Sequence, residues 1–216
     1  MKITRPIRAV LFDMDGVMVD SEFVYMKYLL EFAKEKNPAV TMEDINQMVG
    51  RSRQDSWTVM ERAVNNGETW ETLIKEWAER DIYSRIDYRK IFRPEMKTTV
   101  QELKRRGYTV ALVSSTGPKL ISRIVEEVGM RPEFDLIVSG KQFKQSKPNP
   151  EIYHYTADTL GIREDECFVV EDSTVGIEAA YRAGMSIAGL KDDRFGFDQG
   201  KADYHIDSIS DILKYL

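Results

Sequence analysis

The sequence predicts an α/β protein whose parallel sheet is covered by helices on both faces and interrupted by one all-helical insertion. Residues 7–12 form a short apolar run, as expected for a buried strand. From residue 94 onward, segments with helical and strand patterns alternate, which is the βαβ rhythm of a parallel sheet. Between these two regions, apolar residues recur only at helical spacing. The 216 residues are enough for one domain that carries a smaller insertion.

The first strand is predicted at about residues 7–13, and a long helical stretch follows it. Helical spacing is clear there in Phe23, Met26 and Leu29. Helices are expected at residues 21–36, 41–48, 53–66 and 69–87. Because no strand separates these helices, we expect residues 20–93 to form an inserted helical domain. The core would then consist of residues 1–19 and 94–216.

Strands and helices alternate in the rest of the chain. The helices are expected at residues 95–106, 118–129, 150–161 and 174–183, and the strands at 108–114, 135–139, 166–171 and 185–190. The strand at residues 7–13 must join this sheet, since its backbone would otherwise be unpaired. The predicted fold is therefore a Rossmann-like, doubly wound parallel sheet.

The composition is that of an ordinary soluble globular protein, with 42% hydrophobic and 31% charged residues. A net charge of -5 argues against a general nucleic-acid-binding surface. No apolar stretch is long enough to span a membrane, and Asp13 interrupts the first apolar run too early for a secretory signal. The single cysteine, Cys167, cannot form an internal disulfide, so we expect a cytoplasmic protein.

Polar residues directly follow several of the predicted strands. They are Asp13 with Asp15, Ser114, Lys147, and Glu171 with Asp172. The carboxyl ends of parallel strands meet at one edge of a sheet, where open α/β sheets bind ligands. Taken singly, Ser114 could be a helix cap or turn residue, and Lys147 a solvated loop lysine. Asp172 or Ser173 could be the N-cap of the helix that follows. Their joint position at successive strand ends indicates a single site.

Asp13 and Asp15 indicate the chemistry of that site. A buried strand gains no stability from acids at its end, and two carboxylates this close repel each other unless a cation or a shared proton separates them. An anionic nucleophile that approaches a phosphoryl group also needs a cation, and Mg²⁺ prefers oxygen ligands. The pair therefore indicates a metal-assisted phosphoryl-transfer site.

Together these residues resemble the four signature motifs of the haloacid dehalogenase superfamily. In chain order, the matching segments are Asp13-x-Asp15-Gly16-Val17, Ser114, Lys147-Pro148-Asn149-Pro150 and Glu171-Asp172-Ser173. A helical insertion directly after the first motif is similar to the branch of β-phosphoglucomutases and small sugar-phosphate phosphatases. The resemblance implies a magnesium-dependent phosphoric monoester hydrolase for a small phosphorylated substrate, with residues 20–93 as its cap.

The resemblance also implies roles for the core residues. Asp13 would attack phosphorus and form an aspartyl-phosphate, while Asp15 would act first as general acid and then as general base. Lys147 would offset the charge of Asp13 and hold a phosphoryl oxygen. The Ser114 hydroxyl and the Ser115 N–H would donate to other phosphoryl oxygens.

The acid at position 15 distinguishes phosphate-ester chemistry from the other reactions of the superfamily. Haloacid dehalogenases proper and phosphonatases have no acid at this position, so Asp15 implies an alkoxide leaving group and hence a phosphate ester. The implied metal ligands are an Asp13 oxygen, the Asp15 main-chain carbonyl and the Asp172 carboxylate. Glu171 would lie close by or bind the metal directly.

Three cap residues are candidates for substrate binding: Ser21, Tyr25 and Arg53. Ser21 could also cap the first cap helix. The segment Gly50-Arg51-Ser52-Arg53 resembles the loop in which β-phosphoglucomutases bind a distal phosphate with an arginine, and Arg53 matches that arginine. The mutases have a histidine at the position of Tyr25, so the sequence favours a phosphatase, with a mutase as the alternative.

A third hypothesis is a non-catalytic protein that binds a phosphorylated metabolite. Such proteins usually lose the nucleophile or the metal carboxylates, whereas Asp13 and Asp172 are both present. We therefore expect an enzyme, and a monomer, since its own cap could close the site. His154 and His205 have no metal-ligand partners at suitable spacing and are predicted to be structural.

Overall fold

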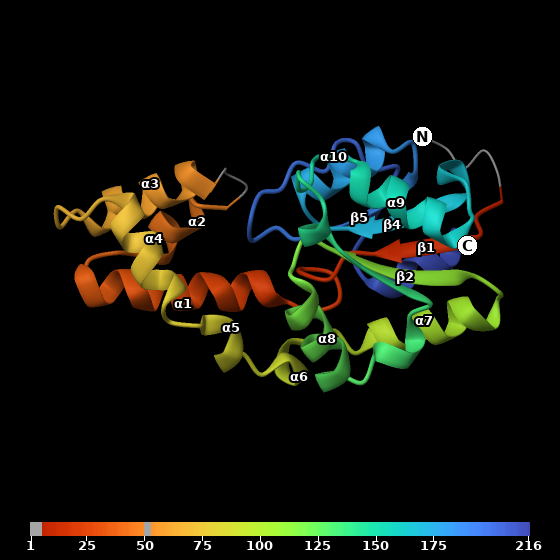
Figure 1. Cartoon of the computed structure of the whole chain (residues 1–216), viewed down its shortest axis with the longest axis horizontal. Coiled ribbons are helices and arrows are strands. Elements are labelled where there is room, and N and C mark those ends of the chain that lie inside the picture. The colour runs from red at the N-terminus through yellow and green to blue at the C-terminus, as the bar shows by residue number, and fades with distance from the viewer. Residues whose placement is uncertain (1–5, 50–52) are drawn as a thin grey trace. The chain divides into compact units, whose positions relative to one another are not determined.

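The chain, described here by a computed structural model, forms two compact units (Figure 1). The structure describes residues 6–49 and 53–216, except for the side chain of Arg53. Unit 1 contains the described residues up to Asp20 together with Tyr88–Leu216, and unit 2 is Ser21–Asp87. The second division falls at residues 87/88 and not at 93/94. The reason is that Tyr88 is buried in unit 1, where its N–H donates to Glu127 at 2.9 Å.

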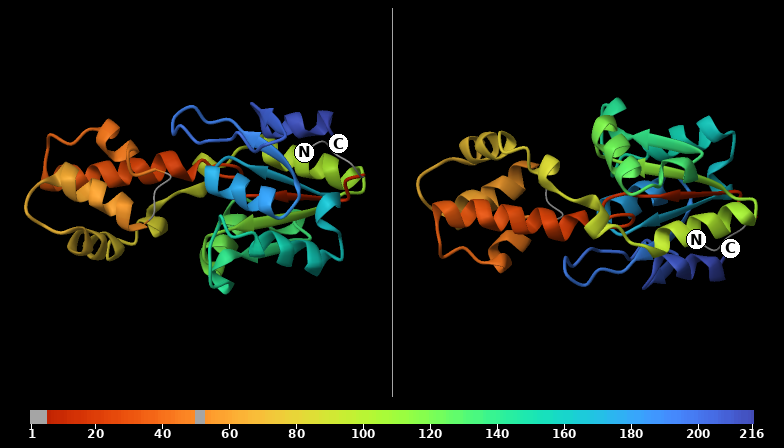
Figure 2. Two further views of the ribbon diagram at one scale, coloured as in Figure 1. Left: turned by 90° about the horizontal axis from the view of Figure 1, so that it is seen from above. Right: turned by 90° about the horizontal axis from the view of Figure 1, so that it is seen from below.

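Unit 1 is built on the predicted parallel sheet. Its strands are β1 (Ala9–Phe12), β2 (Thr109–Ser114), β3 (Leu136–Ser139), β4 (Cys167–Glu171), β5 (Ser186–Leu190) and β6 (Tyr204–Ile206). The order is β3-β2-β1-β4-β5-β6, and each neighbouring pair is parallel. Figure 2 shows β1 in red in the middle of the sheet, with green strands on one side and blue strands on the other. The prediction that the first strand joins this sheet is confirmed.

Helices cover both faces of the sheet (Figure 1). Helices α7 (Glu95–Arg105) and α8 (Pro118–Glu127) lie on one face, and α9 (Glu151–Leu160) and α10 (Thr174–Arg182) lie on the other. The chain changes face between β3 and β4, as right-handed crossovers require when the strand order reverses direction. Shorter helices complete the unit: α6 (Tyr88–Ile91) and the 3₁₀ segments η1 (Arg131–Glu133), η2 (Gly140–Gln142), η3 (Glu164–Glu166) and η4 (Ile209–Lys214).

Strand β6 was not predicted from the sequence. It has only three residues, Tyr204–Ile206, too few for a recognisable alternation of apolar and polar side chains. Its place at the sheet edge depends on pairing with β5, where Leu190 lies opposite Ile206.

The alternation of side chains along the strands positions the candidate site. Leu11 on β1 and Val169 on β4 belong to the buried cluster that also contains Tyr153 of α9. Side chains two residues apart on a strand point to the same face. Asp13 and Glu171, each two residues further along, are therefore directed toward the face covered by α9 and α10.

Unit 2 is helical: α1 (Ser21–Lys36), α2 (Met42–Asn46), α3 (Arg53–Val64), α4 (Trp70–Ala78) and α5 (Ile82–Arg85). Trp57 and Trp77 are buried, and both rings contact the Phe32 ring, at centroid distances of 6.2 and 5.5 Å. The predicted single helix at residues 69–87 is wrong, because Asp81 adopts a left-handed conformation with φ 43° and separates α4 from α5.

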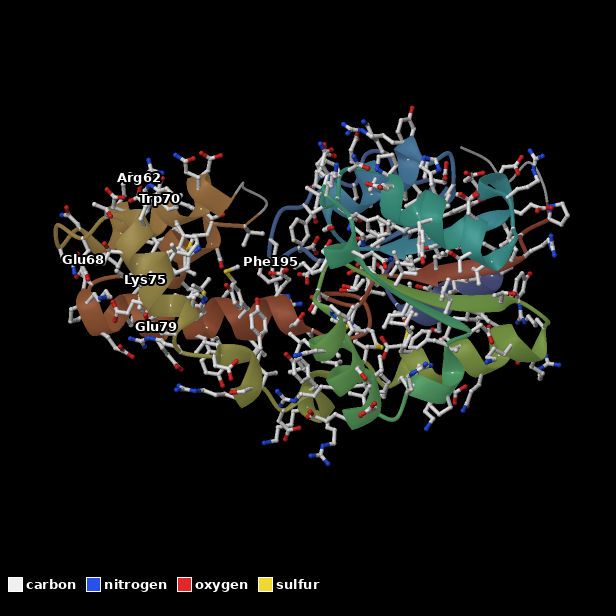
Figure 3. All side chains as sticks on the ribbon, viewed as in Figure 1. Arg62, Glu68, Trp70, Lys75, Glu79 and Phe195 are labelled. Atoms are coloured by element: carbon white, nitrogen blue, oxygen red, sulfur yellow. The ribbon has the colours of Figure 1, made fainter. Side chains whose placement is uncertain are left out.

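The surface of unit 2 carries charged side chains of both signs. Figure 3 labels Arg62, Lys75 and Glu79 among them, and all are exposed. Among the residues that the structure describes, no helix is both long and apolar enough to cross a bilayer.

Candidate active site

Asp13 and Glu171 meet because β1 and β4 are neighbours in matched register. Phe12 lies opposite Val170, and the Asp13 N–H donates to the Val170 carbonyl at 3.0 Å. The residues that follow, Asp13 and Glu171, therefore place two carboxylates side by side. Both are buried, with Asp13 7% and Glu171 1% exposed. The structure thus brings together two acids separated by most of the chain.

Lys147 joins these two carboxylates. Its ammonium donates to Asp13 Oδ1 at 2.6 Å, to Glu171 Oε1 at 2.7 Å and to the Val113 carbonyl at 3.2 Å. The side chain is only 3% exposed, so the alternative of a solvated loop lysine is wrong. Burial alone would lower the pKa of Lys147, but the Asp13 and Glu171 carboxylates hold it well above its ordinary value. Lys147 is therefore a fixed positive charge beside Asp13.

Glu171 is held by donors on both of its oxygens. Oε1 accepts from Lys147 and, at 3.2 Å, from the hydroxyl of Tyr153. Oε2 accepts from the Asp172 N–H, the Ser173 N–H and the Ser173 hydroxyl, at 3.1, 3.2 and 3.0 Å. Ser173 is also the N-cap of α10, where its hydroxyl accepts from the Gly176 N–H. Glu171 therefore fixes the start of α10 and the position of Lys147.

Three buried carboxylates could hold a metal ion. Asp13, Glu171 and Asp172 each offer an oxygen, and these oxygens lie within 4.8 Å of one another. When ionised, three carboxylates against the single charge of Lys147 leave two negative charges, which is the charge that one divalent cation offsets. Burial and the neighbouring Glu171 raise the pKa of Asp13 well above its ordinary value, although Lys147 acts in the opposite direction. An all-oxygen donor set of this kind fits Mg²⁺.

Gly16 makes room for this cluster. The residue has φ +81°, and a Cβ added to it would lie 1.9 Å from Asp172 Oδ2. Its N–H donates to the Val19 carbonyl at 2.8 Å, so a tight turn follows β1. Only glycine allows both this conformation and the approach of Asp172.

Asp15 lies on the turn that follows β1 and contacts residues that follow β2. Its Oδ2 accepts from the Thr116 hydroxyl at 2.9 Å and from the Ser114 hydroxyl at 3.4 Å. Ser114 is fully buried, and its oxygen accepts from the Thr116 N–H at 3.0 Å. The next residue, Ser115, contacts the Ser146 hydroxyl at 3.2 Å. The predicted grouping of Asp15 and Ser114 at one edge of the sheet therefore exists in the structure.

The three predicted substrate-binding residues of the cap belong to unit 2. Ser21 begins α1 and is buried. The Tyr25 hydroxyl accepts from the Trp77 indole N–H at 3.0 Å, and its ring stacks on Tyr83 with centroids 5.8 Å apart. Arg53 begins α3, and its side chain lies outside the described residues, as do residues 50–52. The substrate contacts of these residues stay predictions.

Comparison with known proteins decides the family. Residues 10–190 match the model of the family described as haloacid dehalogenase-like hydrolase. The chain belongs to this family. The motifs that the sequence analysis identified at the strand ends lie within the matched region, so the resemblance to the haloacid dehalogenase superfamily is confirmed.

Individual proteins are similar over most of the chain. A phosphoglycolate phosphatase of Photorhabdus laumondii is 27% identical and covers 100% of this chain and 94% of its own length. A phosphorylated carbohydrates phosphatase of Thermotoga maritima is 26% identical over 83% of this chain and 82% of its own. The crystal structure of a β-phosphoglucomutase from Clostridium difficile has the same fold, with a TM-score of 0.72, 22% identity and coverage of 97% and 95%.

Two residues of this haloacid dehalogenase-like site were missed by the sequence analysis. Tyr153 occupies an apolar position of α9, so its sequence pattern indicates a core residue. A buried tyrosine hydroxyl nevertheless needs a hydrogen-bond partner, and this requirement could have pointed to a contact with the site. Burial raises the pKa of Tyr153 well above its ordinary value, so it remains a donor to Glu171. Thr116 gave no comparable signal, because loops after strands commonly contain threonine.

Proposed function

We propose that this protein is a magnesium-dependent phosphatase that hydrolyses a small phosphorylated metabolite, a sugar phosphate, through an aspartyl-phosphate on Asp13. The observation that carries the proposal is the buried Asp13 carboxylate, held by Lys147 at 2.6 Å in a cluster that leaves two negative charges for a cation. A purely structural ion pair would not need the additional carboxylates of Glu171 and Asp172. Family membership and the phosphatases among the relatives support this function.

The residues of the chain divide the reaction between them. Asp13 attacks phosphorus while the bond to the leaving oxygen breaks, and Asp15 gives that oxygen a proton. Water then attacks the aspartyl-phosphate, Asp15 accepts a proton from it, and Asp13 is released. Lys147 holds Asp13 and would also bind a phosphoryl oxygen, with Ser114 and the Ser115 N–H as further donors.

Mg²⁺ would be held by Asp13, Asp172 and the Asp15 main-chain carbonyl, with Glu171 beside them. When bound, Mg²⁺ supplies positive charge that offsets the repulsion between Asp13 and the phosphoryl group. Glu171 already accepts several hydrogen bonds, which favours a role in positioning over direct ligation. Burial and the neighbouring Glu171 raise the pKa of Asp13, and a nearby cation would favour its ionised form.

The choice of a sugar phosphate rests on the resemblance and on the phosphorylated carbohydrates phosphatase among the relatives. We expect residues 21–87 to act as the cap and to provide substrate contacts through Ser21, Tyr25 and Arg53. The expected setting, a monomer in the cytoplasm, stays a prediction.

Mutase activity is the second candidate, and Arg53 is the residue that favours it. An arginine that binds a distal phosphate would retain a bisphosphate for a second transfer. Tyr25 argues against it, since this position is a histidine in the mutases. Its hydroxyl accepts from Trp77, a contact that belongs to the packing of unit 2.

Phosphorus NMR distinguishes these functions. The purified protein is incubated with Mg²⁺ and a panel of phosphorylated sugars that includes β-glucose 1-phosphate, with chelator and Asp13→Asn as controls. Inorganic phosphate that forms only without chelator and only with Asp13 supports the phosphatase. Conversion to glucose 6-phosphate with little free phosphate would replace it by the mutase. Normal phosphate release by Asp13→Asn would refute the aspartyl-phosphate mechanism.

A further inference from the structure

The contact between Thr116 and Asp15 has the geometry of a positioning interaction. Thr116 lies two residues beyond the end of β2, and its hydroxyl donates to Asp15 Oδ2 at 2.9 Å. The Ser114 hydroxyl reaches the same oxygen only at 3.4 Å, near the limit for a hydrogen bond. Thr116 is therefore the stronger of these two donors to Oδ2.

We propose that Thr116 positions Asp15 for proton transfer, by holding Oδ2 and so fixing the orientation of the carboxyl group. This inference rests on the proposed function, in which Asp15 is the general acid and base. A carboxyl group that transfers a proton efficiently must present the correct oxygen within hydrogen-bond reach of the leaving group. A donor that is itself held in place restricts the orientation of the carboxyl group for this transfer.

The backbone of Thr116 is itself fixed by two strands. Its N–H donates to Ser114 Oγ at 3.0 Å, and its carbonyl accepts from the Ser139 hydroxyl at 2.6 Å. Ser114 ends β2 and Ser139 ends β3, and these two residues are paired in the sheet. Threonine is also restricted at χ1 by its β-branch. The position of the hydroxyl is therefore determined by the sheet.

The proton follows a balanced path in both steps. In the first step, the bond from Asp13 to phosphorus forms, the bond from phosphorus to the leaving oxygen breaks, and the proton moves from the Asp15 carboxyl group to that oxygen. In the second step, water bonds to phosphorus, the bond between phosphorus and Asp13 breaks, and a proton of the water moves to the Asp15 carboxylate. Thr116 keeps its own proton throughout and donates it to Oδ2.

The leaving group of the substrate provides the test. An alkyl phosphate releases a strongly basic alkoxide that needs the proton of Asp15, whereas p-nitrophenyl phosphate releases a stable phenolate that does not. The variants are Thr116→Val, which keeps the shape but loses the hydroxyl, and Thr116→Ser, which keeps the hydroxyl. Thr98→Val, at an exposed threonine of α7, is the matched control. Both kcat and KM are measured, and the ratio kcat/KM includes only the steps up to release of the alcohol.

We expect Thr116→Val to lower kcat/KM for the alkyl phosphate roughly 10- to 100-fold, a part of the usual contribution of a general acid. For p-nitrophenyl phosphate we expect a change below about threefold. Thr116→Ser should recover most of the loss, and Thr98→Val should behave as wild type. Thr116→Val should also show a rapid burst of p-nitrophenolate, because water activation by Asp15 becomes slow while phosphorylation of Asp13 does not.

Three results would overturn the inference. Equal losses on both substrates would mean a structural role, and a loss confined to KM would mean a role in substrate binding. A gain in turnover would mean that Thr116 holds Asp15 away from the reaction. In each case the active wild type would still support the proposed phosphatase. A wild type without activity on any phosphate ester would refute both the proposed function and this inference.

Discussion

The replacement of Lys147 by methionine tests the central claim about the site, that one ammonium balances two buried carboxylates. Methionine keeps an apolar side chain of similar length but has no charge. Lys147 is 3% exposed, and it lies 2.6 Å from Asp13 and 2.7 Å from Glu171. The substitution therefore leaves two carboxylates buried without their shared cation.

The expected loss of stability follows from this burial. Removing one partner of a buried ion pair typically costs about 3–5 kcal/mol. This is a large fraction of the roughly 5–15 kcal/mol that stabilises most proteins. For a chain of this size, each kcal/mol lowers the melting temperature by about 2–4 °C, so a decrease of about 6–20 °C is expected. Turnover should be lost in the same variant.

The assay must report on unit 1. All three tryptophans, Trp57, Trp70 and Trp77, lie within Ser21–Asp87, so tryptophan fluorescence follows unit 2. Urea unfolding should therefore be followed by far-ultraviolet circular dichroism together with fluorescence, in chelator. We expect the free energy of unfolding obtained from the circular dichroism curve to be lower for Lys147→Met than for wild type. The fluorescence curve gives the stability of unit 2.

The control and the second mutation make the result specific. Lys144→Met changes an exposed lysine in the same loop and should alter the free energy by less than about 0.5 kcal/mol. Adding Asp13→Asn to Lys147→Met should recover part of the loss, with a coupling energy of about 1–3 kcal/mol. A Lys147→Met variant as stable as Lys144→Met would refute the reasoning, because the charge would then not be needed by its neighbours.

Three further predictions concern the same cluster. Gly16→Ala should abolish the rise in melting temperature that Mg²⁺ produces in wild type, because the added Cβ would displace Asp172. Asp13→Asn, measured in chelator, should be more stable than wild type at neutral pH. Since the folded-state pKa of Asp13 is raised, its protonated form stabilises the fold at low pH and this stability is lost as pH rises, so the difference should shrink on acidification. Tyr153→Phe should cost about 1.5–3 kcal/mol of unfolding free energy, measured in urea, because Glu171 loses a donor.

Two of these substitutions have a matched control in the chain. Gly107 has φ +89° with nothing within 4 Å of an added Cβ, so Gly107→Ala shows backbone strain alone and should keep the Mg²⁺ response. Tyr155→Phe alters an exposed tyrosine of α9 and should leave stability unchanged. A gain in stability of Asp13→Asn that does not depend on pH would contradict the assignment of a raised pKa.

The candidate site was largely predictable because its residues occupy strand ends. Asp13, Ser114 and Glu171 each follow a short apolar run, and parallel strands bring their carboxyl ends to one edge. Lys147 was predicted as part of a motif, but its burial between two carboxylates was not. Whether a lysine is solvated or buried between two carboxylates depends on where the loop before α9 lies relative to the ends of β1 and β4, which local patterns do not encode.

Local pattern alone determined the parallel sheet, the helical insertion and the residues at the strand ends. Apolar periodicity and turn residues act over a few neighbouring positions, so they can be read from the chain. Only the tertiary structure decided that both oxygens of Glu171 accept hydrogen bonds. It also decided that the Tyr153 hydroxyl donates to Glu171 and that the Thr116 hydroxyl donates to Asp15. These contacts join residues far apart in sequence. Their geometry depends on strand register and on burial, which exist only once the sheet has formed.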